Sequence, residues 1–122
     1  MWSFLWWGKL NEKDRNIKKN YEFKKVFSRG KYFGRKNIEI FILKNNNDIN
    51  RIGIAVSKKV AKSVKRNRIK RLIRENYRLI EKDIKVGYDM VLLWRKNRDI
   101  KYANFDNIEE DMREIFKKVE IL

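Results

Sequence analysis

Ten lysine and arginine residues lie between residues 58 and 78 of this sequence, against one acid, Glu75. Guanidinium groups bind phosphate well, because their planar fork can donate two parallel hydrogen bonds. The apolar residues of the same stretch recur at helical spacing, at Ile69, Leu72, Ile73, Tyr77 and Ile80. They predict a helix that begins between Val60 and Val64 and ends near Ile80. Its opposite side is a polar stripe of Asn67, Lys70, Arg71, Arg74 and Arg78.

The alternative interpretation of this helix is a solvated amphipathic face, which is what most runs of charge are. Two features favour a polyanion instead. Like charges recur four residues apart, as in Arg66 with Lys70 and Lys70 with Arg74, and such pairs destabilise a helix slightly. Cations also crowd the start of the helix, where the helix dipole favours anions: Lys62, Lys65, Arg66 and Arg68. A bound phosphate would turn both features into attractions.

The composition argues against several classes of enzyme. The chain has no Cys and no His, so it lacks a thiolate nucleophile, a Cys-based zinc site and the commonest general base. It also has no glycine-rich phosphate loop. With 32 Lys and Arg residues against 16 Asp and Glu residues, its formal net charge is +16, which attracts polyanions. A binding role is therefore favoured over self-sufficient catalysis.

The elements that must position the basic helix form one α+β domain, predicted over residues 15–122 with the order α-β-β-β-α-β-α. A first helix is predicted to begin with Asn20 as its N-cap and to end at Gly30 in the C′ position, with Phe23 and Phe27 on one face. A last amphipathic helix is predicted over residues 103–118. Residues 1–14 are predicted to be a disordered extension, with Leu10 as a possible natural start.

The strands are predicted from a period of two. Residues 37–43 alternate, with Ile38, Ile40 and Ile42 on one face and Glu39, Phe41 and Leu43 on the other. Residues 51–57 alternate in the same way, and an extended piece through Tyr32 and Phe33 precedes a turn near Gly34. The continuous apolar run over residues 90–94 predicts a central strand that is covered on both faces.

Two segments of the sequence resemble a known family. The stretch Ser57-Lys-Lys-Val-Ala-Lys-Ser-Val-Lys-Arg-Asn-Arg-Ile-Lys-Arg-Leu-Ile-Arg-Glu75 is similar to the signature of the bacterial ribonuclease P protein subunit. The motif Arg66-Asn67-Arg68 lies at its centre. The stretch from Ile17 to Phe27 resembles the first helix of that family, and the resemblance extends from about Arg15 to Phe116.

The resemblance implies a subunit of the endoribonuclease that removes the 5′ leader from precursor tRNA. It implies that the partners are the ribonuclease P RNA and precursor tRNA, that the RNA is the catalyst, and that Mg²⁺ is held mainly by this RNA. It further implies a four-stranded sheet with a left-handed β-α-β crossover, whereas the general rule for such crossovers is right-handed. We expect the RNA subunit to contact Lys62, Lys65, Arg66, Asn67, Arg68, Lys70, Arg71 and Arg74.

The resemblance also implies that Phe23, Phe27 and Phe41 line a cleft for the single-stranded leader. A place in the core is the commoner role of any one aromatic residue. For Phe41 the sequence gives a further reason, because it lies opposite the isoleucines of its strand. The small residues Gly53, Ala55 and Ser57 on the next strand would give it a shallow floor, where a stacked base is worth ~1–3 kcal/mol. Lys58 and Lys59, which follow that strand, are placed with the leader site, although contact with the RNA subunit remains an alternative.

Three alternative functions remain open at this point. A structural basic protein of ribosomes or chromosomes would share the charge but would not need an aromatic cleft. A metal-dependent nuclease could use Asp89 or the acidic last helix, but these acids are expected on a solvated face. A peripheral membrane protein could use the Trp-rich start and the basic helix. We expect a cytoplasmic protein that has no membrane attachment, no metal site of its own and no obligatory protein partner.

Overall fold

Helices and strands form where the hydrophobic periodicity predicts them. The computed structural model describes residues 15–122, and their element order is the predicted α-β-β-β-α-β-α, with two short 3-10 turns added. The helices are α2 (Asn20–Arg29), α3 (Ser63–Ile80) and α4 (Phe105–Lys118). The strands are β1 (Lys31–Gly34), β2 (Ile38–Lys44), β3 (Arg51–Ala55) and β4 (Tyr88–Trp94). The 3-10 turns are η1 (Glu81–Asp83) and η2 (Ile100–Tyr102).

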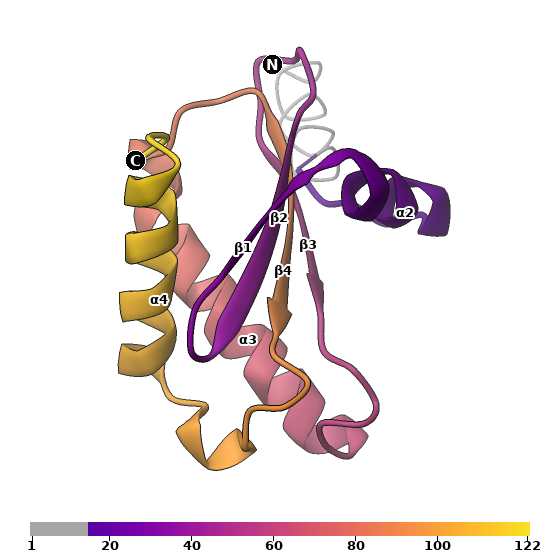
Figure 1. Ribbon diagram of the computed structural model, residues 1–122, viewed down its shortest axis with the longest axis vertical. Helices are drawn as coiled ribbons and strands as arrows, with labels where there is room; N and C mark the ends of the chain where they lie inside the picture. Colours follow the sequence, from indigo (N-terminus) through magenta and orange to yellow (C-terminus); the bar gives the residue numbers. More distant parts are fainter. Residues whose placement is uncertain (1–14) are drawn as a thin grey trace, which may run out of the picture.

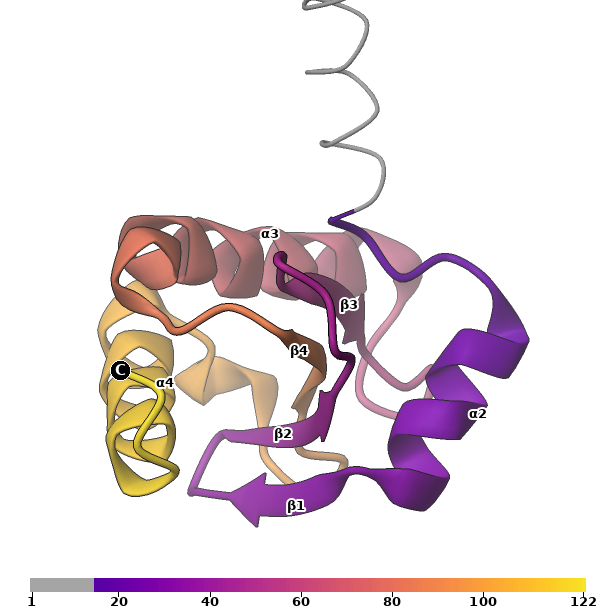
Figure 2. The ribbon, with the colours of Figure 1, turned by 90° about the horizontal axis from the view of Figure 1, so that it is seen from above.

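The strands of the described residues form one mixed sheet in the order β1-β2-β4-β3. The pairs β1–β2 and β2–β4 are antiparallel, and β3–β4 is parallel. The parallel pair is connected through α3, and this crossover is left-handed, as Figures 1 and 2 show together. The α+β fold and its handedness therefore agree with the resemblance and not with the usual rule for β-α-β units.

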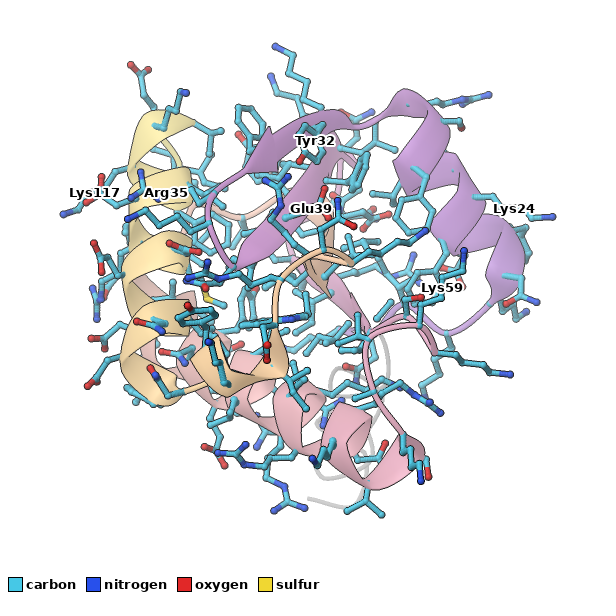
Figure 3. The ribbon with its side chains drawn as sticks, turned by 60° about the horizontal axis from the view of Figure 1, so that its bottom comes forward. Lys24, Tyr32, Arg35, Glu39, Lys59 and Lys117 are labelled. Atoms are coloured by element: carbon cyan, nitrogen blue, oxygen red, sulfur yellow. The ribbon has the colours of Figure 1, made fainter. Side chains whose placement is uncertain are left out.

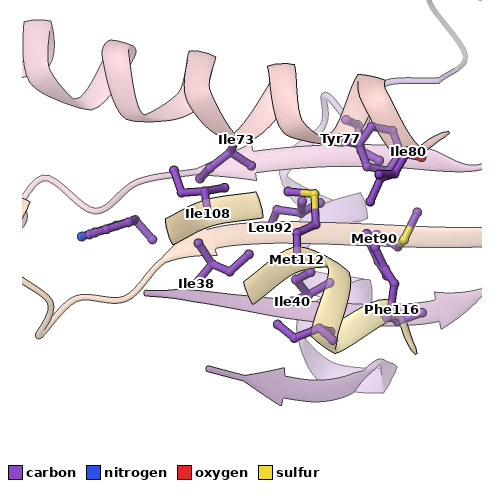
Figure 4. Close-up of a cluster of buried hydrophobic side chains, with 14 of the residues drawn as sticks. Ile38, Ile40, Ile73, Tyr77, Ile80, Met90, Leu92, Ile108, Met112 and Phe116 are labelled. Carbon is purple, nitrogen blue, oxygen red and sulfur yellow. The ribbon is translucent and has the colours of Figure 1, made fainter. Parts of the chain in front are cut away.

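The face of the sheet that carries the isoleucines of β2 supports the main core. Ile38, Ile40, Met90 and Leu92 are fully buried there beneath α3 and α4 (Figure 4). Each fully buried side chain of this size stabilises the fold by ~1.5–3 kcal/mol. The opposite face is covered by α2 alone among the described helices (Figure 2). Its core is small, and part of its apolar surface stays accessible.

Both predicted caps of α2 were wrong in detail. Lys19, and not Asn20, is the N-cap residue, because Glu22 lies three positions after Lys19 and approaches its backbone N–H at 3.4 Å. Gly30 ends the helix with an extended backbone, at φ −74° and ψ 158°, rather than a left-handed one. Glycine is required there for space, since a Cβ atom would lie 2.5 Å from the carbonyl oxygen of Val26.

The expectation that Asp89 and the acids of α4 are solvated was wrong for two of them. Asp111 is 2% exposed, and its Oδ2 accepts a hydrogen bond of 2.7 Å from the backbone N–H of Asn37. Asp89 is also buried, and it accepts a hydrogen bond of 2.9 Å from Asn45 Nδ2. A carboxylate can be buried where such donors meet it. Both acids therefore hold the fold together.

Two features of residues 15–122 bear on the alternative functions. No helix there is long and apolar enough to cross a membrane. Within the same range, no three His, Cys, Asp or Glu side chains are grouped closely enough to hold a metal ion. The predicted extension of residues 1–14, with its Trp-rich start and Leu10, lies outside the described residues.

Candidate nucleic-acid interface

Helix α3 turns one side to the core and the other side outwards. Its inner side buries Ile69, Ile73 and Tyr77, and burial raises the pKa of Tyr77 well above its usual value. Its outer side and N-cap carry the residues predicted to bind the RNA subunit, which we name the basic stripe: Lys62, Lys65, Arg66, Asn67, Arg68, Lys70, Arg71 and Arg74. All of these side chains are exposed except Arg66 and Lys70, which are half-buried.

The start of α3 presents hydrogen-bond donors without an acid nearby on the helix. Its first turn contains no acidic residue, and the N-cap Lys62 provides no side-chain cap. The first backbone N–H groups of a helix have no partner within the helix, so they can donate to an anion. Arg66 is fixed beside them, because its Nη1 donates a hydrogen bond of 2.9 Å to the carbonyl of Ala61. Within the basic stripe, the start of α3 is therefore the part whose donors are best arranged to bind a phosphate.

Phe23, Phe27 and Phe41 lie together on the face of the sheet that α2 covers. The ring centroids of Phe23 and Phe27 are 6.5 Å apart, and those of Phe27 and Phe41 are 5.1 Å apart in an edge-to-face arrangement. Phe27 is 39% exposed although it belongs to this cluster. The structure thus brings the three predicted residues together, with edges and faces that solvent can still reach.

The cluster has a fourth member that sequence reasoning missed. Tyr32 is the cross-strand partner of Phe41, its ring centroid is 5.3 Å from that of Phe41, and its side chain is 47% exposed. We name the four rings the aromatic row: Phe23, Phe27, Phe41 and Tyr32. β1 is only four residues long, so its sequence carries no pattern that could assign Tyr32 to a face. Only its register with β2 does so.

The Glu39 carboxylate lies near the Tyr32 hydroxyl and raises the pKa of Tyr32 above its ordinary value, both as a hydrogen-bond acceptor and through its negative charge. Partial burial of the ring acts in the same direction, and Arg95 acts in the opposite one. The phenol therefore stays protonated at neutral pH. Figure 3 shows Tyr32 and Glu39 close together on β1 and β2.

The prediction that Gly53, Ala55 and Ser57 form a floor beside Phe41 was wrong, because β4 lies between β2 and β3 in the sheet. Phe41 pairs with Val91, and Gly53 lies on the far side of Val91, where it faces Phe23 instead. A Cβ atom on Gly53 would lie 2.5 Å from Cε1 of Phe23. Gly53 therefore leaves the space in which the Phe23 ring rests.

Helix α2 is fixed to this face by charge as well as by packing. Arg51 of β3 forms an ion pair with Glu22 of α2, and its Nη1 lies 3.9 Å from Asp89 of β4. Val26 of α2 is buried with Val91. Helix α2, which carries two rings of the aromatic row, is thus held in place by a partly buried charge cluster that was not predicted from the sequence.

Lys58 and Lys59 lie in the turn between β3 and α3, and both are exposed. The turn is held by Ser57, whose Oγ accepts a hydrogen bond of 3.2 Å from the backbone N–H of Lys59. Figure 3 shows Lys59 on this connection. Along the chain, the two lysines therefore link strand β3, which carries Gly53, to the start of the basic stripe.

A polar groove connects the two surfaces at the edge of β3. Its cavity has a volume of about 390 Å³, and its lining residues include Lys18, Phe23, Gly53, Ile54, Arg74 and Arg78. One member of the aromatic row and one member of the basic stripe thus line the same groove. Arg78 was predicted on the polar side of its helix, but neither Arg78 nor Lys18 was predicted to belong to the site.

The ribonuclease P family model matches residues 11–120 of the sequence. The chain belongs to the ribonuclease P protein family. Its relatives include the ribonuclease P protein component of Clostridium botulinum (strain Loch Maree / Type A3), 46% identical over 110 residues that cover 89% of this chain and 97% of that protein. The corresponding protein of Clostridioides difficile (strain 630) is 44% identical over 108 residues, which cover 88% and 93% of the two chains.

Solved structures of ribonuclease P proteins share the fold. The protein from Staphylococcus aureus matches with a TM-score of 0.77 and 29% identity, over 88% of this chain and 96% of that one. The protein from Thermotoga maritima matches with a TM-score of 0.75 and 27% identity, over 84% and 96%.

Membership of the family settles the general function. The protein is a component of ribonuclease P, the ribonucleoprotein endonuclease that matures the 5′ ends of tRNA, and its partners are the ribonuclease P RNA and precursor tRNA. A nuclease of this kind generally works with a divalent metal. Membership of this family therefore explains the positive charge. The two alternatives, a generic basic protein and an independent nuclease, are no longer needed to explain it.

Proposed function

We propose that the basic stripe binds the ribonuclease P RNA and that the aromatic row holds the single-stranded 5′ leader of precursor tRNA. Lys58 and Lys59 then neutralise leader phosphates between the two surfaces. In this arrangement the protein adds contacts that mature tRNA cannot make, because mature tRNA has no leader. The result is a higher affinity for substrate than for product.

The observation that carries this proposal is the separation of two kinds of surface. The basic stripe offers exposed cations on a helix, which suits the phosphates of a structured RNA. The aromatic row offers partly exposed rings, which suit unstacked bases. A protein that only neutralised RNA would have no use for the second surface.

The described residues do not fit a catalytic metal site of their own. The buried carboxylates of Asp89 and Asp111 are already engaged by Asn45 and by Asn37, and no metal-holding group of His, Cys, Asp or Glu occurs within residues 15–122. We propose that Mg²⁺ is held mainly by the RNA, as the family resemblance implies, and that the protein, acting in the cytoplasm, lowers the repulsion between RNA chains. The same range, residues 15–122, contains both proposed binding surfaces, and we propose it as the functional domain.

The test is cleavage of precursor tRNA at low Mg²⁺ by the protein alone, by a bacterial ribonuclease P RNA alone, and by both together. We expect cleavage at the mature 5′ end only with both. In parallel, equilibrium binding to the reconstituted enzyme is measured for precursor tRNAs with leaders of one to eight nucleotides. Affinity that rises with leader length for the wild-type protein, and does not rise for Phe41→Ala, supports the assignment of the aromatic row. Equal dependence on leader length in both proteins would overturn it.

A further inference from the structure

The end of the aromatic row at Tyr32 has polar groups that stacking alone does not require. The Tyr32 hydroxyl reaches diagonally across the β1–β2 pair to Glu39, whose own cross-strand partner is Gly34. A side chain at Gly34 would collide with this ring, since its Cβ atom would lie 2.9 Å from Tyr32 Cζ. The same Cβ position is 3.3 Å from Nη1 of Arg95. The Tyr32 phenol, the Glu39 carboxylate and the Arg95 guanidinium group therefore lie close together beside Gly34.

The charge of Glu39 is unusual for its location. The ion pairs among residues 15–122 involve the acids Glu22, Asp89, Glu109 and Asp111, and Glu39 is not one of them. It is half-buried on the face that we assign to the leader. A carboxylate there repels leader phosphates, but it accepts hydrogen bonds strongly from N–H groups. On an RNA-binding face, such N–H groups belong to the edges of bases.

We propose that Tyr32 and Glu39 form a base-specific subsite in which the Tyr32 ring stacks on a leader guanine and the Glu39 carboxylate accepts hydrogen bonds from its N1–H and N2–H groups. This inference rests on the proposed binding of the leader by the aromatic row. It adds a preference for one base at one position, which stacking by itself does not give, because every base has a π-face.

The choice of guanine follows from the donors and acceptors at the subsite. Guanine presents two adjacent N–H donors on its Watson–Crick edge, which match the two oxygens of a carboxylate. Adenine and cytosine each present one amino group there, and uracil presents one imino group between two carbonyl groups. Arg95 stands beside the pair with its Nη1 donating 2.9 Å to the carbonyl of Arg35, and a guanidinium group has further N–H donors for guanine O6. The Tyr32 hydroxyl lies beside the carboxylate as a further donor, and a carboxylate has acceptor capacity for it as well as for the base.

The first experiment scans the leader base by base with the reconstituted holoenzyme. Precursor tRNAs carry G, A, C, U or inosine at each single leader position, and their dissociation constants are measured with the wild-type protein. We expect one position where guanine binds about tenfold more tightly than adenine. Inosine, which lacks the N2 amino group, is expected to bind with intermediate affinity there. No position with a guanine preference would overturn the inference.

The second experiment assigns the preference to residues. Glu39→Gln has the same size but can accept through only one atom, and we expect it to lose most of the guanine preference at that position. Tyr32→Phe keeps the ring and is expected to weaken the preference without abolishing it. The matched control is Glu110→Gln, an exposed acid of α4 that makes the same change of charge away from the row. Glu39→Gln with the wild-type preference intact would overturn the inference.

The outcomes also separate this inference from the function on which it rests. Phe41→Ala tests the aromatic row as a whole, through the dependence of affinity on leader length. If Phe41→Ala removes that dependence and Glu39→Gln changes no base preference, the row binds the leader without the guanine subsite. If neither variant has an effect, the leader lies elsewhere and both proposals fail.

Discussion

The basic stripe and the aromatic row differ in how they are built. The stripe belongs to one continuous helix and its N-cap, so local sequence alone sets the spacing of its charges. The aromatic row takes its rings from three elements, α2, β1 and β2, and depends on the register between Tyr32 and Phe41 and on the seating of Phe23 over Gly53. A charged helix can attract RNA even when its side chains move. Stacking needs the rings in fixed places, so the row depends on the integrity of the fold in a way that the stripe does not.

The two surfaces also respond to different conditions. Binding to phosphates releases counterions, so the affinity of the stripe should fall steeply with salt. Stacking depends on apolar contact, which salt screens little. Variants of the two surfaces should therefore separate in a plot of affinity against salt.

The largest effect is expected from removing three exposed arginines of the stripe together, in Arg68→Ala, Arg71→Ala, Arg74→Ala. Binding to the ribonuclease P RNA should weaken about a hundredfold at physiological salt, and the slope of log affinity against log salt should flatten by about three units. Filter binding over a range of salt concentrations measures both quantities. The control variant replaces Lys85, Lys117 and Lys118, which are exposed outside the stripe, and should change the slope much less. Equal slopes for the two triple variants would remove the stripe as a specific contact.

The next effect is expected from Phe41→Leu, which keeps an apolar side chain against Val91 but removes the flat ring. Affinity of the holoenzyme for precursor tRNA should fall about tenfold, as expected for the loss of one stacked base. Affinity for mature tRNA and for the RNA subunit should stay unchanged. Competition binding between precursor and mature tRNA gives the ratio directly, and a ratio equal to that of the wild type would speak against the row.

Gly53→Ala tests the seating of the row without touching a ring. The added methyl group would overlap Phe23 at 2.5 Å, so the ring must shift, and we expect a loss of about 1–3 kcal/mol of stability from overpacking. Precursor affinity should fall by a few fold, while binding of the RNA subunit keeps its salt slope. Urea unfolding measures the first change. The double variant Gly53→Ala, Phe23→Leu should recover part of the stability, because the smaller side chain leaves room for the methyl group.

The smallest effect is expected from Arg68→Ala alone. One phosphate contact should be lost, and the salt slope for RNA-subunit binding should flatten by about one unit, with little change in the ratio between precursor and mature tRNA. The comparison with the triple variant shows whether the contacts are additive. An unchanged slope would mean that Arg68 faces no phosphate in the complex.

The fold was predictable to the extent that its patterns are local. The period of two in β2 placed Ile38, Ile40 and Ile42 in the main core and left Phe41 on the other face, and the helical spacing in α3 separated its core from its basic stripe. The apolar run of β4 predicted a central strand, but the identity of its neighbours, β2 and β3, was not readable from any pattern, because pairing between distant strands leaves no local signal. The left-handed crossover came only from family resemblance.

The parts of the site that were missed depend on contacts between distant segments. Tyr32 joins the row through register, and Arg51 fixes α2 through an acid 29 residues earlier in the chain. Asp111 looked solvated because its helix is rich in acids, yet its carboxylate meets a backbone N–H group 74 residues away. In each case the side chain's surroundings come from the tertiary structure, and the sequence nearby contains no trace of them.

The central place of β4 has a consequence for the order of events during synthesis. β2 and β3 do not pair with each other, and each of them pairs with β4, which follows α3 in the chain. The ribosome must therefore complete the basic helix before the sheet that carries it can close. During that interval the nascent chain presents its cations, without their folded support, beside the ribosome's own RNA. Binding to the wrong RNA therefore competes most directly with folding while the ribosome is synthesising residues 63 to 94.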